Sequence, residues 1–490
     1  MVFQNNVLLG ASGSGTTTHT IDQSIRFNSA DSAYMYKTPS SASNRRTWTV
    51  SCWFKLATDG ISSDFRVLFG AHDNSTSDNA TYFNVGLTEV GIFYVGAWAN
   101  NWLVTNRVLR DNSAWYHVVV TFDTTNVVST ERVRLYINGV RETSFSTNTA
   151  PALNFEGGWN NNNQHSIGRV NYTSGSGPYY FNGYITEIYH IDGLALDCNS
   201  FGEFNSSGIW VPKDASGLTF GTNGYYIDGR DSADLGDDES GQGNDYTVSG
   251  LAAHDQMTGE SPTNNFCVLN PISKPSYDSG VTVRGVSGVN LSSISKPSGN
   301  TNGFAFGTMG VTSGKWYYEL YTTTYPAVEA LGLGWIDAEN SQTATSSGSG
   351  WRDFGVNQRH TTSAYSSWVW GSNESTSTGL TPFQASVVVG VATDFDNNTF
   401  TLTTNGSAYG SVDFDSTSPT QDLTDGTIWL PKSELANDAV ALVTFNFGQD
   451  STFNGQITAG GNADGNGVGN FKYSVPSGYL ALCSKNLGAD

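Results

Sequence analysis

Short apolar runs that alternate with polar residues recur along this chain, and clusters of Gly, Asn, Asp and Ser separate them. Because side chains of a β-strand point alternately to its two faces, such a pattern of period two predicts half-buried strands. The clearest examples are residues 47–56 with Trp48, Val50, Cys52, Phe54 and Leu56 on one face, residues 115–123 with Tyr116, Val118, Val120 and Phe122, and residues 132–137 with Val133, Leu135 and Ile137. Helical periodicity is nearly absent, and only residues 196–204 suggest a short helical turn.

A device shared by the two halves of the chain indicates two domains of similar topology. In each half an apolar strand ends at an Asp, a turn follows, and a second strand leads into Asn-Gly, the strongest short signal for a β-hairpin. The device spans Asp123 to Asn138 and again Asp396 to Asn405. The predicted fold class is therefore all-β, with two β-sandwiches in tandem.

Composition excludes several classes of protein. Aromatic residues make up 13% of the chain, which is too many for a disordered protein, and Lys, Glu, Ala and Leu are too few for a helical bundle. No apolar run approaches the ~18 residues of a membrane helix, so no membrane insertion is expected. The formal charge of −21 argues against nucleic acid as a partner, since phosphate contacts dominate that affinity. The four cysteines are far apart, and we expect free thiols.

The two halves are separated by a polar region, residues 213–300, which the sequence predicts to be an acidic linker. Residues 228–245 carry seven carboxylates among Gly and Ser. A solvated linker is the simpler interpretation, and a calcium loop is the alternative because Ca²⁺ prefers clustered oxygen ligands. The calcium candidates are Asp234, Asp237, Asp238 and Asp245, although their spacing is not that of an EF-hand. No other cofactor is expected.

Motifs for catalysis are missing from the sequence. It contains no G-x-S-x-G, no H-E-x-x-H and no phosphate-binding glycine loop. Glycosidases need two carboxylates that flank the scissile bond, and the nearest pair on one strand, Glu187 and Asp192, points to opposite faces. The sequence therefore predicts no enzyme activity and assigns no catalytic residue.

Aromatic side chains beside amides suggest glycan binding, because a sugar offers both C–H faces and hydroxyl groups. The best candidate is the loop that begins at Trp159, and two further tryptophan groups resemble it. The candidate glycan-binding residues are Trp159, Asn161, Asn162, Gln164, His165, Trp98, Trp102, Trp351 and Trp368. The alternative is that these tryptophans are buried in the sandwich, where Trp is usually found.

Two stretches of the chain resemble known families. Residues 21–212 resemble a LamG-like concanavalin A-type lectin/glucanase domain through TWTVSCWFKL (47–56), WYHVVVTFD (115–123) and RLYINGV (134–140). Residues 301–490 resemble a SPRY domain with a C-terminal tail, through SGKWYYELY (313–321) and VVGVATDFDNNTFTLTTNG (388–406). Both resemblances imply that the two sandwiches are concanavalin A-like or jelly-roll β-sandwiches. The catalytic carboxylate motif of the glucanases is absent, so their activity is not implied.

The order of these modules is similar to that of LamG–SPRY virion proteins of marine bacteriophages. This resemblance implies a structural protein of the tail fibre, spike or head-decoration type, made in the bacterial cytoplasm and assembled on the virion surface. Its expected partners are further copies of itself, most simply as a homotrimer, other virion proteins and host-surface glycans. Residues 1–20 are expected to dock onto a neighbouring subunit, with Val7–Leu9 as the apolar anchor, and the alternative is a frayed terminus. The alternatives are a free carbohydrate-binding lectin and a glycan hydrolase or depolymerase.

Overall fold

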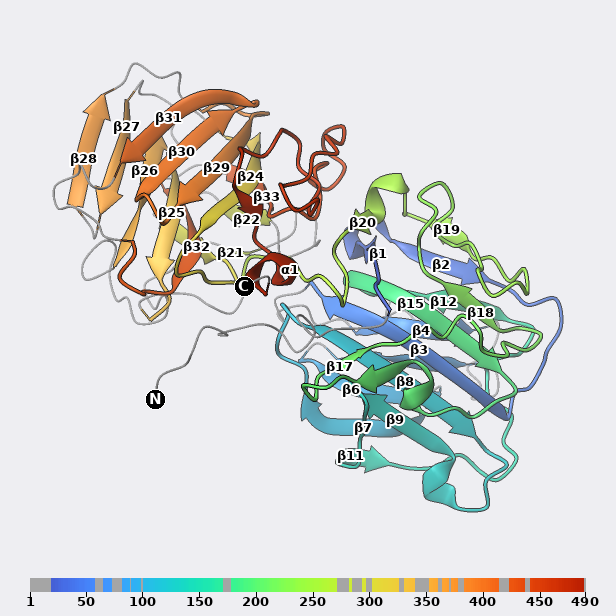
Figure 1. The fold of residues 1–490 in the computed structure, drawn as a ribbon. Helices are drawn as coiled ribbons and strands as arrows, with labels where there is room; N and C mark the ends of the chain where they lie inside the picture. Colours follow the sequence, from blue (N-terminus) through green and yellow to red (C-terminus); the bar gives the residue numbers. More distant parts are fainter. Residues whose placement is uncertain are drawn as a thin grey trace. The chain divides into compact units, whose positions relative to one another are not determined.

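The described part of the chain forms two compact units. The computed structural model describes residues 19–57, 65–72, 82–88, 90–97, 100–170, 178–270, 282–283, 293–296, 302–325, 330–339, 352–359, 364–369, 372–377, 383–413, 423–436 and 441–488. The first unit ends at Asn265 and the second begins at Phe266 (Figure 1). Each unit is a β-sandwich, which confirms the predicted fold class.

The first sandwich consists of two large sheets, named here after their central strands. The β3 sheet has the order β10 (Val140–Arg141), β9 (Val133–Ile137), β8 (Trp115–Asp123), β3 (Thr47–Leu56), β15 (Gly183–Asp192), β1 (Gln23–Phe27) and β20 (Gln256–Thr258), with β18 (Tyr225–Ile227) also paired to β15. The β4 sheet has the order β11 (Phe145–Asn148), β7 (Asn100–Val108), β6 (Ile92–Ala97), β5 (Phe83–Leu87), β4 (Arg66–His72), β12 (Gln164–Ile167), β2 (Tyr34–Lys37) and β19 (Thr247–Ser249). Two short ladders complete it, β13 (Arg169–Val170) with β14 (Tyr179–Tyr180) and β16 (Gly202–Phe204) with β17 (Trp210–Pro212).

The core of this sandwich follows the alternation in the sequence. Every inward residue predicted for the strands at 47–56, 115–123 and 132–137 belongs to one buried cluster, which also takes side chains from the β4 sheet. Asn138 and Gly139 both have positive φ, 48° and 76°, and connect β9 to β10 as predicted. Positive φ at both central residues is what a two-residue hairpin turn of this kind requires.

The acidic segment predicted to be part of a linker instead belongs to the first sandwich. Its strands β18, β19 and β20 pair with β15, β2 and β1, so the domain extends to Asn265 and not to residue 212. Isolated apolar residues between the carboxylates, among them Leu235 and Tyr246, enter the core. The carboxylates can lie beside this core because they accept backbone hydrogen bonds, as Asp238 does from the N–H groups of Tyr226, Ser240 and Asn244.

The second sandwich also has two sheets. The β24 sheet has the order β21 (Thr282–Val283), β22 (Ser293–Lys296), β33 (Ala441–Asn446), β24 (Lys315–Thr324), β29 (Val388–Asp394), β30 (Thr399–Thr404) and β31 (Ser407–Asp413), with β34 (Leu480–Ala481) parallel to β24. The β25 sheet has the order β23 (Asn302–Phe306), β32 (Trp429–Ala436), β25 (Ala330–Asp337), β26 (Asp353–Arg359), β27 (Ala364–Val369) and β28 (Ser372–Ser377). Side chains from both sheets fill one core, and the predicted Asn405-Gly406 turn connects β30 to β31.

A buried carboxylate fastens the C-terminal segment to the second sandwich. Glu319 on β24 accepts hydrogen bonds from the backbone N–H groups of Lys472 and Tyr473 and from the Tyr317 hydroxyl. Burial raises the pKa of Glu319 to about 7. The predicted C-terminal tail is therefore packed onto the β24 sheet.

In the part of the chain that the structure describes, helical structure is limited to short turns. They are η1 (Ser29–Asp31), η2 (Ser129–Glu131), η3 (Cys198–Ser200), η4 (Ala253–Asp255) and α1 (Ser484–Leu487). The turn expected within residues 196–204 corresponds to η3. Among the described residues, no helix combines the length and apolar character that crossing a bilayer requires. All four cysteines are buried and free, as predicted.

Candidate side cavity of the first sandwich

The loop that the sequence predicted to bind a sugar is folded into the core. The Trp159 side chain is 0% exposed and packs with Trp48 and Phe83, at ring-centroid distances of 6.2 and 5.4 Å. His165 is also buried, and its ring lies 4.6 Å from that of Trp159. Stacking of a sugar on Trp159 is therefore a wrong prediction for this structure, because neither face of the indole is accessible.

The other sequence candidates differ in burial and lie in different parts of the chain. Asn161 and Gln164 are half-buried and Asn162 is exposed, whereas Trp102 is only 4% exposed and belongs to the core. Trp98 and Trp351 lie outside the described residues, as does most of the predicted docking segment 1–20. Trp368 lies on β27 of the second sandwich, paired with Gly355 of β26.

The calcium candidates are not arranged as a ligand set. Asp234 accepts the N–H of Gly236, Asp245 accepts that of Asp238, and Asp238 is occupied by three N–H groups. In the part of the chain that the structure describes, no three His, Cys, Asp or Glu residues come together to hold a metal ion. These aspartates form turns, which explains their spacing by chain geometry alone.

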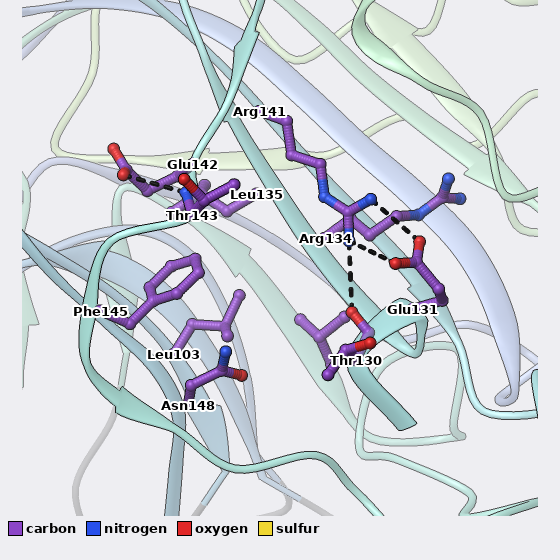
Figure 2. A pocket seen from close by; sticks show the side chains of 11 residues that line it. Leu103, Thr130, Glu131, Arg134, Leu135, Arg141, Glu142, Thr143, Phe145 and Asn148 are labelled. Atoms are coloured by element: carbon purple, nitrogen blue, oxygen red, sulfur yellow. Dashed lines mark hydrogen bonds and ion pairs between the residues drawn. The ribbon is translucent and has the colours of Figure 1, made fainter. Parts of the chain in front are cut away.

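A concave site instead lies at one edge of the first sandwich. It is a cavity of about 250 Å³ between β9 and β10 of the β3 sheet and β7 and β11 of the β4 sheet. Figure 2 shows Leu103, Phe145 and Asn148 on one side and Glu131, Arg134 and Arg141 on the other. The remaining lining residues are Thr130, Val133, Leu135, Glu142 and Thr143. We call this site the side cavity.

Paired charges form the rim of the side cavity. Glu131, at the end of η2, accepts hydrogen bonds from both terminal nitrogens of Arg141, at 2.8 and 3.0 Å. Arg141 also donates to the Thr130 carbonyl. The hydrogen bond from Arg141 lowers the pKa of Glu131. Glu142 accepts the N–H groups of Thr143 and Ser144 and pairs with Arg107 at 2.8 Å. Both carboxylates are thus held in place by charged and backbone partners.

The floor of the side cavity is apolar. Leu103, Val133 and Leu135 are buried members of the core cluster, and Phe145 is half-buried against them. Asn148, at the end of β11, is exposed and adds an amide to the rim. A small ligand with an apolar face and several hydroxyl groups matches this combination, which is typical of small-molecule sites.

The sequence patterns did not indicate any of these residues as a binding site, for a physical reason. The alternation correctly assigned Val133 and Leu135 to the core, yet the cavity is lined jointly by β9 and β11, which belong to different sheets. The one available signal was the Asn138-Gly139 turn, because it directs Arg141 back beside β9. No local pattern relates Arg141 to Phe145 and Leu103 across the sandwich.

Comparison with known proteins agrees with this architecture. Residues 29–192, roughly a third of the chain, match the family model described as the concanavalin A-like lectin/glucanases superfamily. No curated protein sequence matches the chain.

Three solved structures that match the chain have TM-scores below 0.5. The SPRY domain of human HERC1 is 15% identical and covers 37% of this chain and 97% of its own, with a TM-score of 0.28. The LG1-3 region of the laminin alpha2 chain is 11% identical, over 88% of this chain and 63% of its own, with a TM-score of 0.32. A protein from Bacteroides ovatus described as carbohydrate binding is 17% identical, over 51% and 63%, with a TM-score of 0.34. On the family match and its own two sheets, the first sandwich is a concanavalin A-like domain.

Proposed function

We propose that this protein is a carbohydrate-binding protein and that the side cavity holds a neutral sugar residue. The observation that carries the proposal is a concave site with an apolar floor, an aromatic ring and a fixed carboxylate–guanidinium pair. A sugar ring would place its C–H face on Phe145. Neighbouring hydroxyls would donate to Glu131 and accept from Arg141, since each hydroxyl does both.

The charges of the side cavity favour a neutral ligand. Two arginines, Arg134 and Arg141, face two carboxylates, Glu131 and Glu142, so the formal charge of the lining is zero. Glu131 and Arg141 already satisfy each other, and an anionic ligand would have to compete with Glu131 for the guanidinium. Hydroxyl groups can join such a pair without displacing either partner.

The same geometry favours binding over hydrolysis, and we propose that the protein is not an enzyme. A glycosidase needs a carboxyl group with a raised pKa to protonate the leaving group. Arg141 lowers the pKa of Glu131, which is the opposite direction. Incubation with laminarin, capsule and lipopolysaccharide should release no oligosaccharide. Turnover that Glu131→Gln abolishes would overturn this part of the proposal.

The side cavity is tested by ligand-observed NMR titration against a panel of neutral oligosaccharides. One stacked ring and a few hydrogen bonds give a dissociation constant of about 1 mM for the native protein. Phe145→Ala and Arg141→Gln should each weaken binding about tenfold. Leu153→Ala, which removes an exposed apolar side chain outside the cavity, is the matched control and should bind as the native protein does. Native affinity in Phe145→Ala would contradict the assignment.

The biological setting is a further proposal, which rests on the sequence resemblance to phage virion proteins. We place the protein on a virion surface as a tail fibre, spike or head decoration, made in the host cytoplasm and trimeric, with host glycans as its target. Three copies would strengthen millimolar sites through effective concentration. Mass spectrometry of purified particles and sedimentation of the purified protein test this setting. Absence from particles, or a monomer at micromolar concentration, would contradict it.

A further inference from the structure

A second group of side chains gathers on the outer face of the β4 sheet. On β2, Met35 points into the core, so Tyr34 and Tyr36 point outward. On β12, His165 and Ile167 point inward, so Gln164 and Ser166 point outward, and Ser166 is paired with Tyr36. Tyr34, Tyr36 and Gln164 are all half-buried. Neighbouring strands thus present two phenol rings and an amide on one face.

An arginine from a separate hairpin lies over these rings. Arg169 on β13 is paired with Tyr180 on β14. Its guanidinium carbon lies 4.3 Å from the centroid of the Tyr34 ring and 5.6 Å from that of Tyr180. The Tyr34 ring is 5.5 Å from Tyr36 and 6.1 Å from Tyr180. We call Tyr34, Tyr36, Gln164, Arg169 and Tyr180 the tyrosine–arginine platform.

The guanidinium of the platform has hydrogen-bonding capacity to spare. Within the described part of the chain, the guanidinium of Arg169 makes cation–π contacts with Tyr34 and Tyr180, and no carboxylate pairs with it. Of its nitrogens only Nε is both buried and without a partner, so the two terminal nitrogens reach the surface. This differs from Arg141 of the side cavity, which Glu131 occupies.

The rings contribute accessible hydroxyls as well as apolar faces. Tyr34, Tyr36 and Tyr180 are each half-buried. Among the described residues, their hydroxyl oxygens are absent from the set of buried polar atoms that lack a hydrogen bond. Tyrosine and arginine side chains of this kind make strong contacts when a ligand covers them. The arginine is already held by the rings, so it would lose little rotational freedom on binding.

We propose that the tyrosine–arginine platform binds an anionic saccharide. The planar guanidinium would take a carboxylate or sulfate group through its two terminal nitrogens. The ring of the sugar would lie against Tyr36, and the amide of Gln164 would bond a hydroxyl group. This site is separate from the side cavity and differs from it in the charge of the ligand, and it does not depend on the function proposed there.

The experiment uses the full chain and three tetrasaccharides of similar size, one carboxylated (tetragalacturonate), one sulfated (a carrageenan fragment) and one neutral (maltotetraose). Affinities are measured by ligand-observed NMR at low salt. The native protein should bind at least one anionic probe at least tenfold more tightly than the neutral one, and the two anionic arms identify the group preferred. Arg169→Gln should remove this preference, and Tyr36→Ala should weaken binding of the anionic probe about tenfold. Added salt should weaken anionic binding, since the pair is near the surface.

Two control variants show whether anionic binding depends on the platform itself. Arg110→Gln removes the same charge from an exposed position elsewhere in the first sandwich and should leave binding unchanged. Phe145→Ala removes the aromatic ring of the side cavity and should also leave anionic binding unchanged. The experiment therefore tests the platform separately from the side cavity. Circular dichroism checks that each variant is folded. Arg169→Lys keeps the positive charge but loses the planar guanidinium with its two terminal nitrogens, and it should retain only part of the affinity.

Three results would overturn the proposal. The first is equal affinity for anionic and neutral probes in the native protein. The second is native affinity in a folded Arg169→Gln or Tyr36→Ala variant. The third is no saccharide binding together with a change of sedimentation coefficient in Tyr36→Ala, which would identify the face as a contact between copies of this chain.

Discussion

Two aromatic groups lie on opposite faces of the β4 sheet and have opposite surroundings. Trp159 is fully enclosed by Trp48, Phe83 and two histidines, whereas Tyr34 and Tyr36 are half-buried beside an arginine. Both groups stand near polar residues in the sequence. The difference teaches that a polar neighbourhood along the chain does not make an aromatic side chain accessible. The face to which it points decides this, because the inner face is desolvated whatever its sequence neighbours are.

The largest difference between the two faces should appear on acidification. His165 and His190 flank Trp159, and burial lowers the pKa of each to about 3. In the unfolded chain their pKa is about 6.5, so the unfolded state binds more protons between these values. The free energy of unfolding should therefore fall as the pH falls from about 6.5 toward 3, by about 1.4 kcal/mol per pH unit for each histidine.

Urea unfolding followed by tryptophan fluorescence at pH 7, 6, 5 and 4 measures this slope. His165→Gln should reduce the pH dependence of the free energy of unfolding by the contribution of one histidine, about 1.4 kcal/mol per pH unit. A slope that is the same in His165→Gln as in the native protein would show that this histidine is not buried in its neutral form.

Removal of the buried indole should have the next largest effect. Trp159→Ala leaves a cavity among Trp48, Phe69 and Phe83 and should cost about 3–5 kcal/mol of unfolding free energy. Trp159→Phe should cost clearly less, because it keeps most of the volume. Chemical denaturation measures both. A loss below about 1 kcal/mol in Trp159→Ala would contradict the buried position.

The corresponding change on the outer face should scarcely affect folding. Tyr36→Ala should lower the free energy of unfolding by about 1 kcal/mol or less, since the ring is half-buried and does not belong to the core cluster. The same denaturation experiment checks it beside Trp159→Ala. Equal losses in the two variants would remove the distinction between the faces.

The smallest effect is expected in the loop between the two groups. Asn162 is exposed, and its amide donates to the Ser40 carbonyl at 3.0 Å. Asn162→Ala should change stability by about 0.5 kcal/mol and leave both saccharide affinities unaltered. A tenfold loss of binding to either class of probe would show that this loop does take part in glycan binding.

Much of the fold could be predicted from local patterns. The strands at 47–56 and 115–123 begin and end at the predicted residues, and their predicted inward residues all reach the core. The extent of the first domain could not be predicted. The strands β18 to β20 have three residues each, and a three-residue strand carries too little alternation to be recognised within an acidic segment.

The candidate sites were less predictable than the fold. Of the residues that the sequence suggested for glycan binding, only Gln164 belongs to the side cavity or the platform. The side cavity is lined by strands of two different sheets, and the platform combines residues far apart along the chain, such as Arg169 and Tyr34. Residue types suggested glycan chemistry, but not which of thirteen tryptophans and twenty-three tyrosines would be accessible.

The sequence by itself determined the longer strands that alternate, the inward face of these strands and the two Asn-Gly turns. These features depend on neighbours one to four residues away, and the burial of alternate side chains stabilises one register only. The tertiary structure alone decided that Trp159 is enclosed, that Glu131 pairs with Arg141 beside an apolar floor, and that the guanidinium of Arg169 lies over tyrosine rings. Exposure and pairing depend on which distant segment covers a side chain, and that is settled only when the two sheets pack together.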